Sequence, residues 1–157
     1  MDSLLTLFRT TVDPARFDRA VWSRIFNHRR DHSRVPFAVC HPRSIPDVVA
    51  AVKLAKTHDK RISIRSGGHS WAAWSVRHDA VLIDLVGLNG MGIAYDDETG
   101  VGSVPPATTG RELNDFLAGH GRMFAGGHCP DVGMGGFLLQ GGMGWNAKVS
   151  CCSCCVV

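Results

Sequence analysis

Two glycine-rich turns, one near residue 67 and one near residue 133, most constrain what this chain can fold into. Residues 65–71 read RSGGHSW, and residues 126–136 read GGHCPDVGMGG. Glycine lets backbone N–H groups approach a ligand closely and permits positive φ, so such turns commonly hold phosphates. Each turn also carries one nucleophilic side chain, the imidazole of His69 and the thiol of Cys129. Together they predict a large cofactor held covalently at two points.

The two motifs, in this order and at this separation, resemble the FAD-binding (PCMH-type) domain of the vanillyl-alcohol oxidase and p-cresol methylhydroxylase superfamily. Within it they are most similar to the berberine-bridge-enzyme-like branch with doubly attached flavin. There the histidine of an R-x-G-G-H-S loop bonds the flavin 8α-methyl carbon, and the cysteine of a G-x-C-x-x-V-G-x-G-G loop bonds ring carbon C6. The resemblance covers about residues 36–146 and implies that His69 and Cys129 attach FAD. The alternative is two structural turns with a hydrogen-bonded histidine and a small buried cysteine.

The resemblance implies a wider set of cofactor contacts. Backbone amides of residues 66–70 would bind the pyrophosphate, while Arg65 either contacts phosphate or packs its stem and leaves its head in water. Trp71, Trp74 and Trp145 either line the flavin pocket or, for at least two of them, pack in the core. No metal ligand is expected, and the catalytic base is expected in a C-terminal part beyond this sequence. The expected cofactor-binding residues are Arg65, Ser66, Gly67, Gly68, His69, Ser70, Trp71, Cys129, Val132, Gly133, Gly135 and Gly136.

The implied function is flavin-dependent oxidation of an alcohol, sugar or amine-type substrate, with the electrons passing to oxygen. FAD, a small-molecule substrate and oxygen are then the expected partners. A net charge of +3 is too small to indicate nucleic acid. The sequence contains neither an apolar run of membrane length nor a secretory leader pattern, so we expect no membrane partner and a cytoplasmic location.

Three segments are expected: a helical lead-in at residues 1–34, an incomplete PCMH-type domain at residues 35–146, and a divergent cysteine-rich tail at residues 147–157. The tail indicates a truncated or misread reading frame, although a splice form stays open. The chain is then the FAD-binding portion of an oxidoreductase or, alternatively, a non-catalytic or non-functional flavin-binding fragment. A small metal or redox module that uses the tail is a third alternative, but no second ligand pair lies at zinc spacing.

The first half of the chain predicts two helices and two strands. Asp13 and Pro14 form a helix start, and the helix is expected to continue to His28. Residues 35–39 predict a strand. A second helix begins at Ser44, which has capping-box spacing to Asp47, and its expected inward stripe is Val48, Val49, Val52 and Ala55.

The alternating segment Ile62, Ser63, Ile64 predicts a half-buried strand that leads into the first glycine turn. The glycines of that turn do not open a helix, which argues against a dinucleotide-binding Rossmann unit. A strand at residues 80–86, a hairpin from residues 91–95 and 101–104, and a helix capped at Thr109 follow. Leu113, Phe116 and Leu117 are its expected inward residues. The fold class is α+β, a small mixed sheet with flanking helices, as in the N-terminal part of a PCMH-type domain.

Overall fold

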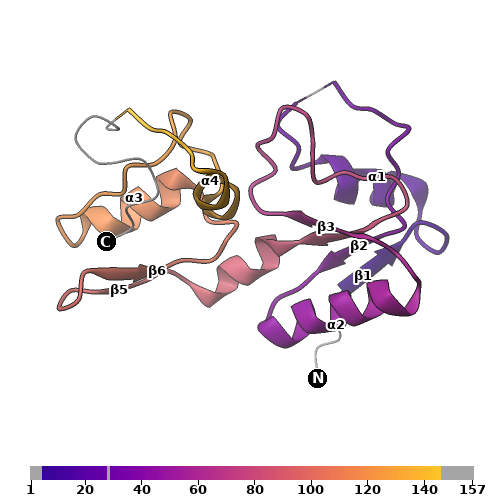
Figure 1. The fold of residues 1–157 in the computed structure, drawn as a ribbon, viewed down its shortest axis with the longest axis horizontal. Helices are drawn as coiled ribbons and strands as arrows, with labels where there is room; N and C mark the ends of the chain where they lie inside the picture. Colours follow the sequence, from indigo (N-terminus) through magenta and orange to yellow (C-terminus); the bar gives the residue numbers. More distant parts are fainter. Residues whose placement is uncertain (1–4, 28, 146–157) are drawn as a thin grey trace.

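The computed structural model describes residues 5–27 and 29–145 and has the α+β fold that the sequence predicts (Figure 1). A four-stranded sheet with a helix on each face is joined through a 3-10 helix to a hairpin and two further helices. The elements are β1 (Leu5–Phe8), α1 (Pro14–Trp22), β2 (Ala38–His41), α2 (Ile45–Thr57), β3 (Ile62–Arg65), β4 (Val81–Asp84), η1 (Leu85–Met91), β5 (Ala94–Asp96), β6 (Val101–Ser103), α3 (Gly110–Ala118) and α4 (Met134–Gln140).

The main sheet has the strand order β1-β2-β4-β3. β1 pairs antiparallel with β2, whereas β2, β4 and β3 run parallel. α1 covers one face and α2 the other, so both faces of the central strands are buried (Figure 1). The carboxyl ends of β3 and β4 consequently meet at one edge of the sheet, where the first glycine turn begins.

Helix α1 starts where the sequence predicts but ends earlier. The Asp13 side chain accepts a hydrogen bond from the Arg16 N–H at 2.9 Å, and Pro14 occupies the first turn. The helix stops at Trp22, and the prediction that it extends toward residue 28 is wrong for the described part of that segment. The reason is tertiary: Arg24 turns inward to Asp84 instead of continuing the helix.

Helix α2 has the predicted capping box, in which Ser44 and Asp47 each bond the other's backbone N–H. The predicted inward stripe is wrong in part. Ala51 and Ala55 are buried, whereas Val49 and Val52 are 48% and 44% exposed. The small side chains face the sheet because the helix lies close against β2 and β4, where Cys40, Val81 and Ile83 complete the cluster.

Strand β3 forms where predicted, but its burial pattern is the reverse of the one its sequence predicts. Ser63 and Arg65 are buried, whereas Ile62 and Ile64 are 37% and 60% exposed. In register, Ile64 lies beside Ile83 and therefore on the α2 face of the sheet. The helix α2 covers the central strands of that face but leaves this edge open. The opposite face of β3 is buried because Arg65 contacts α1.

The remaining strands of the sheet are shifted from their predicted bounds. β2 begins at Ala38 rather than at residue 35, because Pro36 has no N–H for a ladder hydrogen bond. β4 ends at Asp84, where the Asp84 side chain accepts a hydrogen bond from the Val86 N–H at 3.3 Å and begins η1. The predicted strand to residue 86 therefore stops two residues early.

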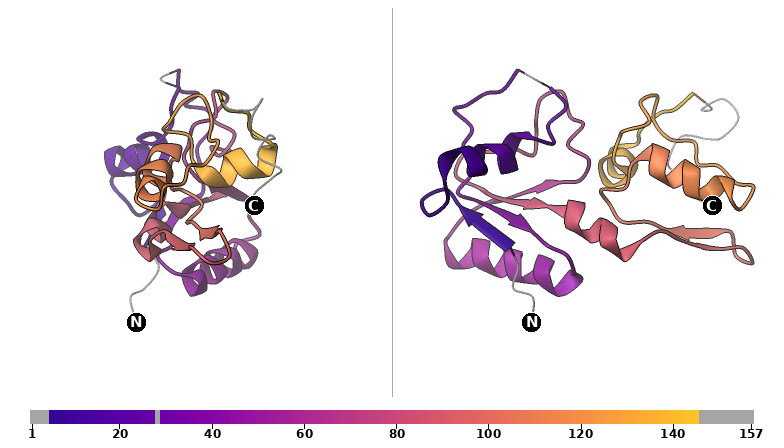
Figure 2. Two further views of the ribbon diagram at one scale, coloured as in Figure 1. Left: turned by 90° about the vertical axis from the view of Figure 1, so that its left-hand side faces the viewer. Right: turned by 180° about the vertical axis from the view of Figure 1, so that it is seen from behind.

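The second half of the chain contains the predicted hairpin and helix. β5 and β6 form the hairpin, although β5 begins at Ala94 rather than at residue 91 because η1 extends to Met91, and the Thr109–Glu112 capping box starts α3. Leu113 and Leu117 are buried and Phe116 is half-buried, as expected. α3 and α4 lie over one side of the hairpin in both views (Figure 1, Figure 2), and Met134 of α4 joins their shared apolar cluster. The helix α4 was not predicted.

No helix within residues 5–27 and 29–145 is long and apolar enough to cross a membrane. Over the same part of the chain, no three His, Cys, Asp or Glu side chains gather in a way that could hold a metal ion.

Candidate functional site at the two glycine-rich loops

The first glycine loop, residues 65–71, leaves the carboxyl end of β3 and turns sharply at Gly68. Gly68 has φ of +78°, a conformation that L side chains rarely adopt. A Cβ at this position would also clash with the carbonyl oxygen of Arg24. The glycine is therefore required by the chain's own packing, before any ligand is considered.

The structure brings the first loop directly against the second, residues 126–136. A Cβ added to Gly67 would lie 2.6 Å from the backbone N of Gly133, and one added to Gly133 would lie 2.5 Å from the backbone N of Gly67. The Ser66 hydroxyl donates to the carbonyl of Pro106, and a Cβ at Gly135 would lie 2.9 Å from the Pro106 ring. The two motifs that the sequence separates by about sixty residues are thus in backbone contact.

The glycines of the second loop differ in what surrounds them. Gly133 and Gly135 pack against protein, whereas no atom of the described residues outside α4 and its chain neighbours lies within 4 Å of a Cβ placed on Gly136. Gly133 also forms a β-bridge with Thr109 and is the N-cap of α4. This helix could not be predicted from the sequence, because three of its first four positions, counting the cap, are glycine, which is a poor helix former. Cofactor contact by these glycines stays a prediction.

Backbone N–H groups are available at the first loop. In the described part of the chain, the amides of residues 67–70 donate no hydrogen bond, and these residues are half-buried. Half-buried amides without a protein acceptor can bond water or an anion such as a pyrophosphate. The residues present therefore fit the phosphate-binding role expected of this loop.

A buried charge cluster lies beneath the loop. Asp84, 1% exposed, forms ion pairs with the guanidinium groups of Arg24 and, at 2.7 Å, of Arg65. Arg24 Nη2 also donates to the Ser66 carbonyl at 2.7 Å. One buried carboxylate thus holds both arginines and, through Arg24, the backbone of the loop itself.

The position of Arg65 differs from both roles considered for it, phosphate contact and a packed stem with a solvated head. Its side chain is 0% exposed, so the interpretation with a solvated head is wrong. The guanidinium donates to the carbonyl oxygens of Ala20 and Val21 as well as to Asp84. It therefore ties the end of α1 to β3 and β4. This arrangement directs the guanidinium into the protein rather than toward a ligand.

Burial shifts the proton affinity of groups around Asp84. Desolvation lowers the pKa of Arg24, against the opposing effect of Asp84. Desolvation also lowers the pKa of His41, with the charges of Arg65 and Arg24 adding to the effect and Asp84 opposing it. His41 Nδ1 is 3.9 Å from the Asp84 carboxylate. No role for Asp84 or Arg24 is predicted from the sequence, because their partners lie far away in the chain.

The two predicted attachment residues lie one on each of the two loops that meet. His69, half-buried, follows Gly67 by two residues, and its ring packs on Phe26 with centroids 4.3 Å apart. Cys129, also half-buried, is a free thiol and precedes Gly133 by four residues. His128, next to it in sequence, packs edge-on against Trp145 at 4.3 Å.

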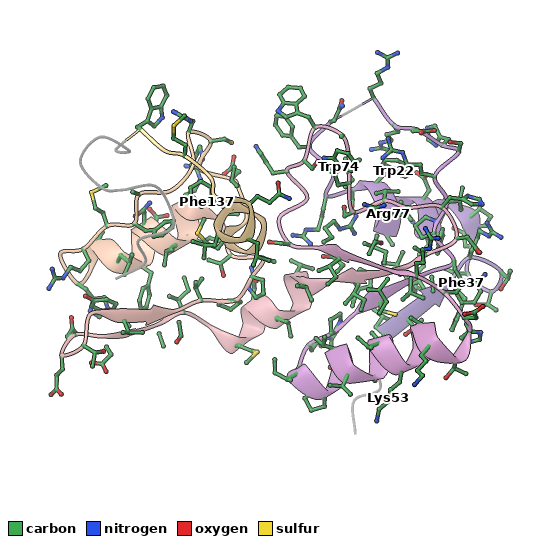
Figure 3. All side chains as sticks on the ribbon, in the orientation of Figure 1. Trp22, Phe37, Lys53, Trp74, Arg77 and Phe137 are labelled. Atoms are coloured by element: carbon green, nitrogen blue, oxygen red, sulfur yellow. The ribbon has the colours of Figure 1, made fainter. Side chains whose placement is uncertain are left out.

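The expectation that at least two of the three tryptophans are buried in the core is wrong. Trp71, Trp74 and Trp145 are 71%, 64% and 80% exposed. Trp74 is labelled in Figure 3, beyond the α1 face of the sheet. Trp71 is part of the first glycine loop, and Trp145 contacts His128 of the second, so both are available to line a cofactor site.

Two surface hollows of the described chain lie away from the glycine loops. One, of about 260 Å³, is lined by residues of α1 and the segment before β2, among them Phe17 and Trp22. The other, of about 330 Å³, is lined by the segments before β3 and β4, among them Arg61 and Arg77. We place the site at the loops because their free amides and two nucleophiles provide chemistry that neither hollow offers.

Comparison with known proteins identifies the family of the chain. The family model described as "FAD binding domain" matches residues 36–157. The FAD-linked oxidoreductase penO of Penicillium crustosum is 45% identical over 146 residues, 93% of this chain and 31% of that protein. A carbohydrate oxidase of Microdochium nivale is 29% identical over 118 residues, 73% of this chain and 24% of that protein.

Among solved structures, wild-type BBE-like 1 of Physcomitrella patens superimposes with a TM-score of 0.83 at 25% identity and covers 96% of this chain and 31% of that one. The chain spans about a third of the length of the curated relatives it matches. A match over most of the chain, together with these relatives, shows that this protein belongs to the FAD-binding domain family of FAD-linked oxidoreductases.

Proposed function

We propose that this chain is the FAD-binding portion of an oxidase that acts on an alcohol, sugar or amine-type substrate. The observation that carries the proposal is the backbone contact between the two glycine loops, each of which carries one nucleophile; the amides of residues 67–70 donate no hydrogen bond to the described residues. Relatives named as a carbohydrate oxidase and a xylooligosaccharide oxidase support the oxidase class. Bound FAD supplies the redox chemistry, because it accepts a hydride and returns the electrons to oxygen.

The chain's own contribution is to bind and orient the cofactor. The amides of residues 66–70 would bind the pyrophosphate, and Arg24 holds this loop through the Ser66 carbonyl at 2.7 Å. The open surface at Gly136 would allow the second loop to approach the flavin closely. Further proposed contacts come from Ser70, Trp71 and Val132. Arg65 contributes by fixing the loop's base from within the protein.

We also propose that FAD is held covalently through His69 and Cys129. The support for this is that both are half-buried residues and that the two loops carrying them are in backbone contact. A thiol reacts as its thiolate, and covalent anchoring fixes the flavin in one orientation. The proposal makes no use of a metal.

The test is the flavin content of the purified chain after loading with FAD and acid denaturation. We expect tryptic peptides of the unsubstituted chain to carry flavin at both residues, and His69→Ala and Cys129→Ala to leave one bond each. The double variant should retain none. Flavin that stays covalent in the double variant would overturn the attachment assignment, and failure of the unsubstituted chain to bind FAD would overturn the proposed function. Oxygen consumption with an alcohol, sugar and amine panel separates an oxidase from a binding-only fragment.

A further inference from the structure

The segment after α1, residues 24–27, runs along the first glycine loop. Its donors bond three carbonyls of that loop: the Arg24 guanidinium at 2.7 Å, the Phe26 N–H at 3.2 Å and the Asn27 side-chain amide at 2.8 Å. The acceptors are, in the same order, Ser66, Gly68 and Trp71. A segment that follows the loop at this spacing fixes the loop's path on one side.

Phe26 is the member of this segment that touches a predicted attachment residue. Its ring lies 4.3 Å from the His69 ring, centroid to centroid, at an interplanar angle of 35°. Trp71 packs edge-on against the same Phe26 ring at 4.9 Å and 79°. Phe26 is 42% exposed, so it is not a core residue whose loss empties a cavity. Its position is better explained by what it covers, which is one face of the imidazole.

We propose that Phe26 is a positioning residue that orients His69 for covalent attachment of the flavin; the inference rests on the proposed function. A ring nitrogen attacks through a lone pair that lies in the plane of the imidazole. Packing on one face of the imidazole restricts the orientation of its plane and leaves the edges with the nitrogen atoms free. His69 makes no hydrogen bond with the described residues, so no hydrogen bond to them fixes its orientation. Phe26 thereby reduces the orientations that His69 samples.

The bond in question forms between a ring nitrogen of His69 and the flavin methyl carbon. It replaces one C–H bond of that methyl group and the N–H bond of the imidazole. The two electrons and two protons released reduce dioxygen to hydrogen peroxide by way of the flavin. Phe26 supplies no atom to this step and acts only through the geometry of His69.

The principal experiment follows covalent attachment over time in the full chain mixed with FAD in air. For Phe26→Ala we expect flavin to join the His69 peptide more slowly by on the order of tenfold to a hundredfold. Attachment to the Cys129 peptide in the same sample should keep its rate, which excludes general damage to the fold. Phe26→Tyr keeps the ring and should restore the His69 rate.

A second measurement needs no flavin. In the unloaded chain, the ring current of Phe26 should shift the carbon-bound protons of His69 upfield in NMR spectra, and Phe26→Ala should remove that shift. Phe26→Tyr, which keeps the aromatic ring, is the matched control and should keep the shift.

Equal rates of His69 attachment in Phe26→Ala and the unsubstituted chain would overturn the inference while leaving the proposed function intact. Equal slowing at His69 and Cys129 would also overturn it, because it would reveal a merely structural role. Absence of any bound flavin on the unsubstituted chain would overturn the proposed function and the inference with it.

Discussion

At the residue scale, the candidate site contains two kinds of glycine: some allow the two loops to pack together, and others border open space. Gly67 and Gly133 allow the two loops to touch, because a side chain on either would overlap the backbone of the other. Gly136 has open space around it. The same residue type therefore has two separable roles within one motif, and substitutions can tell them apart.

Gly133→Ala should separate the loops, because its Cβ would lie 2.5 Å from the backbone N of Gly67. We expect a loss of about 1–3 kcal/mol in the free energy of unfolding, the usual cost of overpacking, and a lower flavin-to-protein absorbance ratio. Urea unfolding and absorbance spectra measure the two effects. Gly136→Ala is the control for the unfolding measurement: its Cβ would lie within 4 Å of no described residue outside α4 and its chain neighbours, and it should be neutral or stabilising by up to about 1 kcal/mol. Equal destabilisation by both substitutions would contradict the loop contact.

His41 should make the fold sensitive to mild acid. Burial lowers the pKa of His41 below its usual value of 6.5. The unfolded chain therefore binds a proton at His41 that the folded chain resists, and stability falls as the pH drops from about 6.5 toward the folded pKa. His41→Gln should flatten this part of the profile. Urea unfolding at a series of pH values checks this, and profiles of equal slope for the two chains would refute it.

The aspartates with a lowered pKa do not change the stability of the fold in the pH range where His41 titrates. The pKa values of Asp31, Asp47, Asp79 and Asp96 lie below their usual value of 3.8, because each accepts hydrogen bonds in the fold. Their contribution to stability is present above that value and is lost only at lower pH. Mild acid above about pH 4 therefore reports on groups such as His41.

At the scale of elements, capping decides where the helices begin, and buried contacts decide where they end. The α3 capping box has the Thr109 hydroxyl accepting from the Glu112 N–H at 3.2 Å while the Glu112 carboxylate accepts from the Thr109 N–H at 2.7 Å. This cap also fixes the strand-like segment that pairs Thr109 with Gly133, next to the loop contact. The start of α3 is thus coupled to the candidate site.

Thr109→Ala should cost about 1 kcal/mol of folding free energy, because the first turn of α3 loses its side-chain acceptor. Thermal unfolding followed by circular dichroism measures the change. Thr57→Ala is the matched control: Thr57 is exposed at the end of α2 and bonds only the Lys53 carbonyl of its own helix, at 3.0 Å. A Thr109→Ala chain as stable as the control would show that the capping box contributes nothing measurable.

At the scale of the whole molecule, two clusters enclose the main sheet, and a third holds the hairpin with α3 and α4. The α2 face remains open at the sheet edge, where β3 exposes Ile62 and Ile64. An exposed apolar edge strand favours association between copies. The division of the chain proposed at residue 146 stays a prediction, and the cysteine-rich tail lies outside the described residues.

Ile64→Lys should lower self-association of the chain, because a charged side chain on an edge strand opposes strand pairing. Sedimentation velocity with a reducing agent present measures the effect apart from disulfide formation. Leu139→Lys is the comparison, since Leu139 on α4 is 90% exposed but lies on no strand edge. An equal fall in both variants would mean that apolar exposure alone, rather than the open edge, drives association.

The sequence by itself determined the features that depend on neighbours a few residues apart. The caps at Asp13, Ser44 and Thr109 bond groups three residues ahead, so each helix start could be predicted to the residue. The β5–β6 hairpin follows from a local turn in the same way. The fold class and the two glycine loops were also predictable, because their motifs are continuous in the chain.

Only the tertiary structure decided which partners those motifs meet. The contact of Gly67 with Gly133, the packing of Phe26 on His69 and the pairing of Arg24 with Asp84 join residues more than 40 positions apart. The tertiary structure also decided which residues of β3 are buried. Ile64 is apolar but exposed, whereas Arg65 is buried because it bonds a carbonyl oxygen of α1. Local hydrogen bonds are encoded by neighbouring residues, whereas a long-range contact exists only after strands and helices have packed, and no local pattern records it.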